Sequence, residues 1–147
     1  MDNNTFVDTE KDISDADLSR VEETFGFSFP SAVRLHCLKY NGGSPQKYLY
    51  KAGDTIFVVH EFLPIRYGKD RLEDTIQSLK HDDEILPKHL VPFAVDPGGD
   101  YYCFSVRSQD QGTIWFYIGD YHDEPEKAAV YVAESLPEFI QGMTEEE

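Results

Sequence analysis

The sequence predicts one α+β domain: a mainly meandering antiparallel sheet of about six strands, with helices at both chain ends packed on it. Three observations lead to this prediction. The chain has 147 residues, a length that suits one domain. Helix-type patterns open and close the sequence, and short apolar segments joined by short turns lie between them. Because short connections join antiparallel neighbours, these segments favour a meander whose apolar face the helices cover.

Two helices are expected near the start of the chain. Ser14 can cap the first, Asp17 can return the bond three residues later, and Gly26 ends it. The second begins at Ser31, after a Phe-Pro step, and has apolar residues on two sides, as a helix covered from both sides would. It ends at three residues that readily take positive φ: Asn41, Gly42 and Gly43.

Two further helices follow later in the sequence. An apolar stripe at helical spacing predicts one around residues 70–80. The other starts at Ser135, which forms a capping box with Glu138 and has Pro137 in its first turn. Between and around the helices, six segments have the composition and alternation of strands. They are residues 48–50, 56–59, 90–95, 101–106, 113–118 and 128–133.

The expected domain covers residues 14–143. We expect residues 1–13 to form a flexible N-terminal segment and residues 144–147 to form a flexible acidic tail, because both are polar and lack a core pattern. No Pro/Gly-rich linker or internal repeat divides the chain.

One short loop could be interpreted as a site. Asp96-Pro97-Gly98-Gly99-Asp100 lies between two expected strands. A phosphate-binding loop would be followed by a helix and would usually contain a lysine, and a calcium loop would carry more oxygen ligands. Pro followed by Gly is instead the preference of a tight turn, so we interpret Gly99 and Asp100 as turn residues.

The charge of the chain restricts its partners. Asp and Glu number 28 against 13 Lys and Arg, which gives a net charge of −15. Such a surface repels phosphate backbones and anionic lipid headgroups, so we expect neither nucleic acid nor membrane as a partner. It favours encounter with a basic protein, although acidity can also serve solubility alone.

Cellular location follows from the cysteines and the first residues. Cys37 and Cys103 stand far apart in apolar surroundings, which indicates buried free thiols. The first residues lack the pattern of a signal peptide, and no apolar stretch is long enough to span a bilayer. We therefore expect a cytoplasmic protein.

The sequence offers no motif for catalysis, metal binding or cofactor binding. His60-Glu61 begins like a zinc-protease motif, but Pro64 stands where the second His is needed. The five histidines show no metal-ligand pairing, and no G-x-S-x-G motif occurs. Carboxylates are too abundant for any one pair to indicate acid–base chemistry. We expect no catalytic residue, no metal, no cofactor and no enzymatic activity.

Two acidic clusters remain as candidate partner-binding residues. The first cluster is Asp82, Asp83 and Glu84, and the second is Asp120, Tyr121, Asp123 and Glu124. One interpretation is solvated loop charge. The other is a docking surface for Arg and Lys, in which Tyr121 serves as an aromatic contact.

Several segments together resemble a known family. They are VEETFGFSFPSAVRLHCLKYNGG, LVPFAVDPGGDYYCFSV, GTIWFYI and VAESLPEFIQGM. In order and spacing they are similar to the SUKH superfamily, which includes a yeast cell-wall assembly regulator and many bacterial immunity proteins. The matching positions are Glu22 or Glu23, Phe29-Pro30, Asn41-Gly42-Gly43, Gly99-Asp100 and Ser135 to Phe139, and the resemblance covers about residues 14–143. Phe29 stands where the family often has Leu.

The resemblance implies an intracellular immunity protein. Such a protein binds and neutralises a cognate secreted toxin, polymorphic or contact-dependent, by occluding its active site, and a basic nuclease-type toxin would suit the charge. A regulatory scaffold without a toxin partner is the alternative, and an uncharacterised enzyme is a third. The shared motifs are turns, caps and core positions, so they transfer no binding site. The toxin, the contact residues and the oligomeric state stay open.

Overall fold

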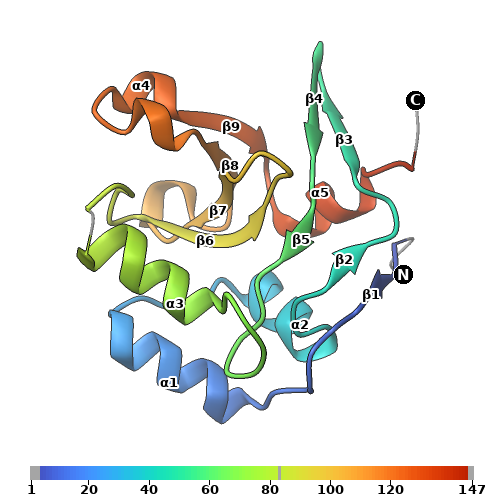
Figure 1. Cartoon of the computed structure of the whole chain (residues 1–147), viewed down its shortest axis with the longest axis vertical. Coiled ribbons are helices and arrows are strands. Elements are labelled where there is room, and N and C mark those ends of the chain that lie inside the picture. The colour runs from blue at the N-terminus through green and yellow to red at the C-terminus, as the bar shows by residue number, and fades with distance from the viewer. Residues whose placement is uncertain (1–3, 83, 146–147) are drawn as a thin grey trace.

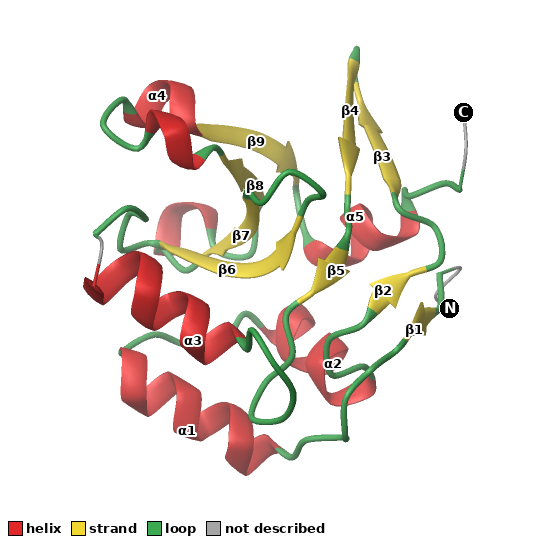
Figure 2. Ribbon diagram, viewed as in Figure 1, coloured by secondary structure: helices red, strands yellow, loops and turns green. Residues whose placement is uncertain are grey.

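A five-stranded antiparallel meander is the centre of the fold (Figures 1 and 2). The computed structural model describes residues 4–82 and 84–145, with only the backbone described at 81 and 82. The strand order is β5-β6-β7-β8-β9, so each strand pairs with its neighbour in sequence, which confirms the predicted topology. The strands are β5 Glu61–Phe62, β6 Leu90–Val95, β7 Tyr101–Ser105, β8 Ile114–Tyr117 and β9 Ala129–Ala133.

Two small two-stranded sheets accompany the meander. β1 Phe6–Val7 pairs with β2 Ser44–Pro45, and β3 Leu49–Ala52 pairs with β4 Thr55–Val58. The first pair joins the meander through a bridge between Gly43 and Phe62. The β3–β4 hairpin projects from the body of the molecule in Figure 1. The sequence predicted both strands of this hairpin as part of one larger sheet, whereas they form a separate two-stranded sheet.

Helices come from both ends of the chain and from its middle. They are α1 Asp15–Phe25, α2 Ser31–Lys39, α3 Leu72–Ile76, α4 Pro125–Ala128 and α5 Leu136–Gln141. A π-helical segment, η1 Gln77–Asp82, continues α3 through most of the predicted 70–80 helix. Short 3₁₀ turns lie at η2 Ser108–Asp110 and η3 Gly119–Tyr121.

The two faces of the sheet bury different cores. Along β7, Tyr102 and Phe104 enter the main core, where Tyr102 lies 5.4 Å from the ring of Phe139 in α5. Cys103, between them, enters a smaller core with Leu86, Leu90, Tyr117 and Ala128. This alternation is the two-faced pattern that the sequence predicts.

The predicted cap of the first helix is confirmed. The backbone N–H of Ser14 donates to the carboxylate of Asp17 at 3.0 Å, and the N–H of Asp17 donates to the Ser14 hydroxyl. At the last helix the predicted box is only half formed. The N–H of Glu138 donates to the Ser135 hydroxyl at 3.2 Å, but the Glu138 carboxylate accepts from the N–H of Glu134 instead of Ser135.

The Asn41-Gly42-Gly43 segment holds three parts of the chain together. The buried Asn41 amide donates to the carbonyls of Lys11 and Ile65, and its oxygen accepts from the N–H of Ile65 at 2.7 Å. Gly43 has φ +95°, and a Cβ there would lie 2.6 Å from the carbonyl oxygen of Val7. The glycine is therefore needed to let β1 approach the main body.

Described residues near both ends of the chain are tied to the core where we expected flexible segments. Phe6 is buried, with ring centroids of His36, Tyr40 and Phe62 within 4.7–5.0 Å. At the other end, the backbone of Thr144 bridges to Leu49. A two-residue strand has too little pattern to be seen in sequence, so the pairing of β1 was missed. Residues 1–3, 146 and 147 lie outside the described residues.

The loop between β6 and β7 is the predicted tight turn. The Asp96 carboxylate accepts from the N–H groups of Gly98 and Asp100 at 3.0 and 2.8 Å, and Gly99 has φ +97°. Both cysteines are free thiols, as predicted: Cys103 is buried and Cys37 is partly buried. Burial raises the pKa of Cys37 to about 12.

Candidate docking groove

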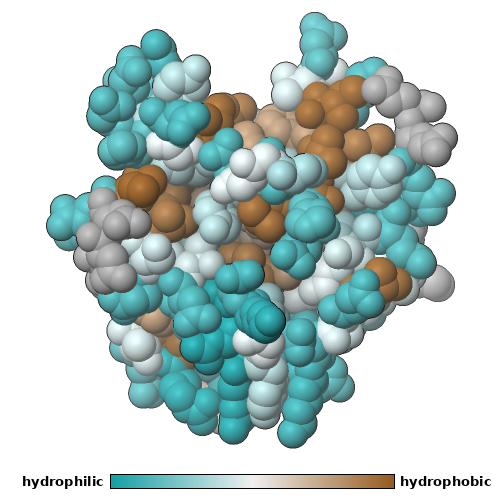
Figure 3. Space-filling view, viewed as in Figure 1, coloured by the Kyte–Doolittle hydropathy of each residue, from teal (hydrophilic) through white to brown (hydrophobic). Residues whose placement is uncertain are grey.

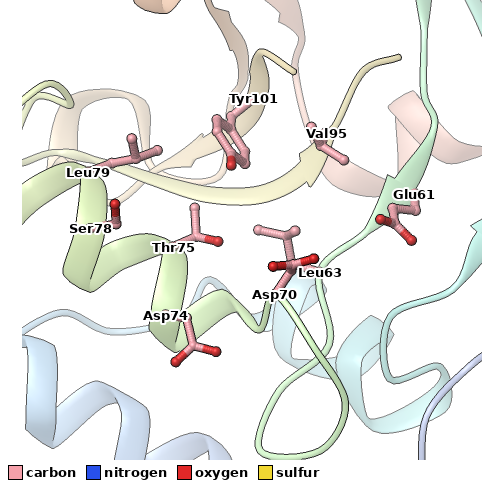
Figure 4. A pocket seen from close by; sticks show the side chains of 9 residues that line it. All are labelled: Glu61, Leu63, Asp70, Asp74, Thr75, Ser78, Leu79, Val95 and Tyr101. Carbon is pink, nitrogen blue, oxygen red and sulfur yellow. The ribbon is translucent and has the colours of Figure 1, made fainter. Parts of the chain in front are cut away.

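Three hollows that share lining residues adjoin one another on the surface. The central hollow, of about 440 Å³, lies between α3 and the strands β5 and β6 (Figure 4). Glu61, Asp70 and Asp74 supply its carboxylates, while Leu79 and Tyr101 belong to its apolar part. We call the three hollows together the acidic groove.

The second hollow extends the groove over the smaller core. It has about 410 Å³ and shares Leu79 and Tyr101 with the central hollow. Ile85 and Tyr117 add to its apolar lining. Two carboxylates, Asp100 and Asp120, stand on it, and the carboxylate of Asp100 is fixed by the N–H of Gly119 at 3.0 Å.

The third hollow extends the groove in the other direction. It has about 430 Å³ and shares Glu61 and Asp70 with the central hollow. Asp8 and Glu10, from the segment after β1, add two carboxylates, and Lys69 adds a cation. The groove therefore brings together segments that stand far apart in sequence.

The acidic groove is strongly one-sided in charge. Its described lining holds seven carboxylates and one lysine. Among the described residues, only Asp74 of these carboxylates forms an ion pair, at 2.8 Å from Arg71. By contrast, a hollow of about 270 Å³ between α1 and the 65–73 segment holds three arginines: Arg20, Arg66 and Arg71. Carboxylates and arginines thus gather in different parts of the surface.

Tyr101 lines both the central and the second hollow. We call the apolar lining residues around Tyr101 the apolar floor and the lining carboxylates the acidic rim. Burial, followed by the charge of Asp70, raises the pKa of the Tyr101 hydroxyl. The hydroxyl therefore stays protonated at neutral pH and can donate a hydrogen bond. In Figure 3 hydrophobic residues on this face show between the α4 region and the β3–β4 hairpin, and hydrophilic residues cover the area over α1 and α3.

The candidate residues of the second acidic cluster lie together around η3 and the start of α4. Asp120, Tyr121, Asp123 and Glu124 are all exposed, and Asp120 lines the groove. Glu124 pairs with Lys127 at 3.2 Å, and the Lys127 ammonium lies 5.8 Å from the Tyr121 ring centroid. Tyr121 and Glu124 thus already have an internal cation for a neighbour.

The first acidic cluster is described only in part. Asp83 lies outside the described residues, and of Asp82 only the backbone is described. Glu84 is exposed and has a positive φ of 55°.

Sequence reasoning missed most of the groove. Five of its carboxylates come from three separate segments, and none stands in a local motif: Asp8 and Glu10, Glu61, and Asp70 and Asp74. With 28 carboxylates in the chain, their gathering was visible only once the fold placed them.

The described residues show neither a metal cluster nor a membrane helix. No three His, Cys, Asp or Glu side chains among them are grouped so that they could hold a metal ion. Within the same part of the chain, no helix has the length and apolar character to cross a membrane.

Comparison with known proteins identifies the family. No curated protein matches the chain. The model of the SMI1/KNR4 family (SUKH-1) matches residues 12–142, nearly the whole chain and almost the range that the quoted motifs cover. The chain therefore belongs to the SMI1/KNR4 family (SUKH-1).

Proposed function

We propose that this protein is an immunity protein that binds one secreted toxin and neutralises it. Membership of the SUKH-1 family fits that role. The observation that carries the proposal is the acidic groove, whose described lining residues include seven carboxylates and a single lysine. A surface of this kind is complementary to a basic protein.

The proposed mechanism is occlusion, and no bond is made or broken. A nuclease-type toxin carries a basic groove for phosphates, and the carboxylates of this chain would occupy that groove in place of the nucleic acid. The net charge of −15 would speed encounter with such a toxin. The protein would act in the cytoplasm of the cell that receives the toxin, without a cofactor and without enzymatic activity of its own.

Co-expression tests this proposal. The toxin domains encoded beside the gene would each be induced in bacterial cells with and without this protein. We expect rescue from one toxin, and a one-to-one complex with that toxin in calorimetry. Rescue from none of them, with stable binding to host proteins instead, would contradict the proposal and favour the regulatory scaffold.

A further inference from the structure

We infer that the acidic groove receives an extended, arginine-bearing segment of the partner, with arginine side chains seated between its apolar floor and its acidic rim. The inference rests on the proposed function only in taking the partner to be the toxin. The chemistry of the seat comes from the groove itself.

The lining of the groove matches the two parts of an arginine side chain. Arginine has an apolar stem and a planar cationic head that stacks on aromatic rings and forks onto carboxylates. Leu79 and Tyr101 form an apolar surface common to two hollows and pack against the smaller core that contains the buried Tyr117. Asp70 and Asp100 stand beside this surface. Lysine would meet the charge but would lack the planar head.

The division into hollows favours an extended segment. The groove consists of three hollows of similar size, and neighbouring hollows share two lining residues. Every second side chain of an extended strand points to the same side. Side chains on one side of such a segment can therefore point into the hollows, while the residues between them face the toxin body.

Charge repulsion argues against a second copy of this chain as the occupant of the groove. A second copy of this chain would bring a further charge of −15 to a rim that is already acidic. The rim carboxylates Asp8, Glu10, Glu61, Asp70 and Asp120 face no ion-pair partner in the part of the chain that the structure describes. A basic segment is the occupant that their charge complements.

Binding of a defined peptide tests the seat. The probe is a fluorescein-labelled nine-residue peptide with arginine at alternate positions, and its counterpart has lysine there. The groove variant is Glu61→Gln with Asp70→Asn. Both changes keep the shape of the side chain, and Asn, like Asp, tolerates the positive φ of 51° at position 70. The control, Glu23→Gln with Asp54→Asn, removes the same charge from exposed positions outside the groove.

Fluorescence anisotropy at 0.1 M salt gives the outcomes. We expect the groove variant to weaken binding of the arginine peptide about tenfold, and the control about twofold at most. We expect the lysine peptide to bind several-fold more weakly than the arginine peptide. Equal weakening by both variants would overturn the inference, because diffuse charge would then explain binding. Equal binding of the two peptides would overturn the arginine seat.

A second measurement locates the peptide in the unaltered protein. In ¹⁵N-labelled wild-type protein, the amides of Thr75, Tyr101 and Gly119 should shift on titration, while those of the β3–β4 hairpin tip should not. Shifts spread over the acidic surface would contradict the inference. The cell test then separates the two ideas. A groove variant that still rescues cells refutes the groove and leaves the immunity role intact, whereas peptide binding without any rescue refutes the immunity role alone.

Discussion

Asp17 shows how one buried carboxylate connects two parts of the fold. Its side chain is 5% exposed and lies 3.0 Å from Arg20 and 2.8 Å from Arg66. Arg66 belongs to the segment between β5 and α3, so this ion pair joins α1 to the middle of the chain. The hydrogen bond from the Ser14 backbone, together with the two arginines, lowers the pKa of Asp17 from 3.8 to about 2.

This pKa predicts how stability depends on pH. Because the folded pKa lies below the unfolded value, the contribution of Asp17 is complete above about pH 4 and is lost as the pH falls through 2. Asp17→Asn should therefore lower the free energy of unfolding at pH 7, and much less at pH 2. Urea unfolding between pH 2 and 7 measures this, with Glu23→Gln on the same helix as the control. Parallel pH profiles of the variant and the wild-type protein would contradict it.

Gly99 tests backbone strain without a change in packing. It has φ +97°, and no atom lies within 4 Å of where a Cβ would stand. Gly99→Ala should therefore destabilise the fold by about 1–3 kcal/mol through strain alone. Gly98→Ala is the matched control in the same loop, since Gly98 lacks a positive φ and its Cβ would meet Asp96 at 3.5 Å, an ordinary contact. Equal urea midpoints for the two variants would show that the turn relaxes.

The caps of the helices allow a test at the scale of elements. Ser135→Ala removes the hydroxyl that accepts from the N–H of Glu138, so we expect a loss of about 1 kcal/mol. Ser31→Ala, at the start of α2, is the control, because Ser31 is exposed and α2 has no side-chain cap. Thermal or urea unfolding of both variants gives the comparison. A loss at Ser31 as large as that at Ser135 would mean that the cap is not the cause.

Strong local pattern decided which elements the sequence could predict. β6 to β9 were found within one or two residues, because their side chains alternate between two buried faces and clear turns bound them. β1, β2 and β5 have only two residues each, too few for a period. Their pairing depends on long-range contacts such as that of Phe6 with Phe62, at 4.7 Å between ring centroids, which no local window contains.

The same reasoning explains what was missed at the candidate site. The acidic loops stood out because their charges are adjacent in sequence. The groove carboxylates Glu10, Glu61 and Asp100 stand about forty to fifty residues apart in the sequence, and only the meander and the β1–β2 pair bring them to one face. One residue, Asp120, belongs both to the second acidic cluster and to the lining of the groove.

At the scale of the whole molecule, the surface charge is unevenly distributed. Among the described residues, the acidic groove is lined by one lysine, while three arginines gather in the hollow beside α1, two of them paired with Asp17. Arg66, one of these arginines, connects α1 to the segment before α3 through its ion pair with Asp17. A basic partner would meet a negative groove flanked by the exposed carboxylates around α4, an arrangement that suits both steering and docking.

Charge steering predicts a salt-dependent association rate. For the toxin identified by co-expression, association should approach about 10⁸–10⁹ M⁻¹s⁻¹ at low salt. It should slow as the Debye length falls from about 30 Å at 0.01 M to about 10 Å at 0.1 M. A triple variant, Asp120→Asn, Asp123→Asn and Glu124→Gln, should slow association further. The fold should survive, because these side chains are exposed and the ion pair that they lose, between Glu124 and Lys127, lies on the surface.

Surface plasmon resonance at both salt concentrations measures these rates. The same neutralisation at Asp82, Asp83 and Glu84 tests the first cluster, and Glu23→Gln with Asp54→Asn shows how much any loss of charge matters. Steering should be strongest for carboxylates close to the docking face, so the triple variant at 120–124 should slow association more than the control. If the wild-type association rate did not depend on salt, and both triple variants associated as fast as the wild-type protein, charge mimicry would be excluded. Recognition would then depend on apolar and shape contacts, for which the floor of the groove around Leu79 and Tyr101 is the first place to look.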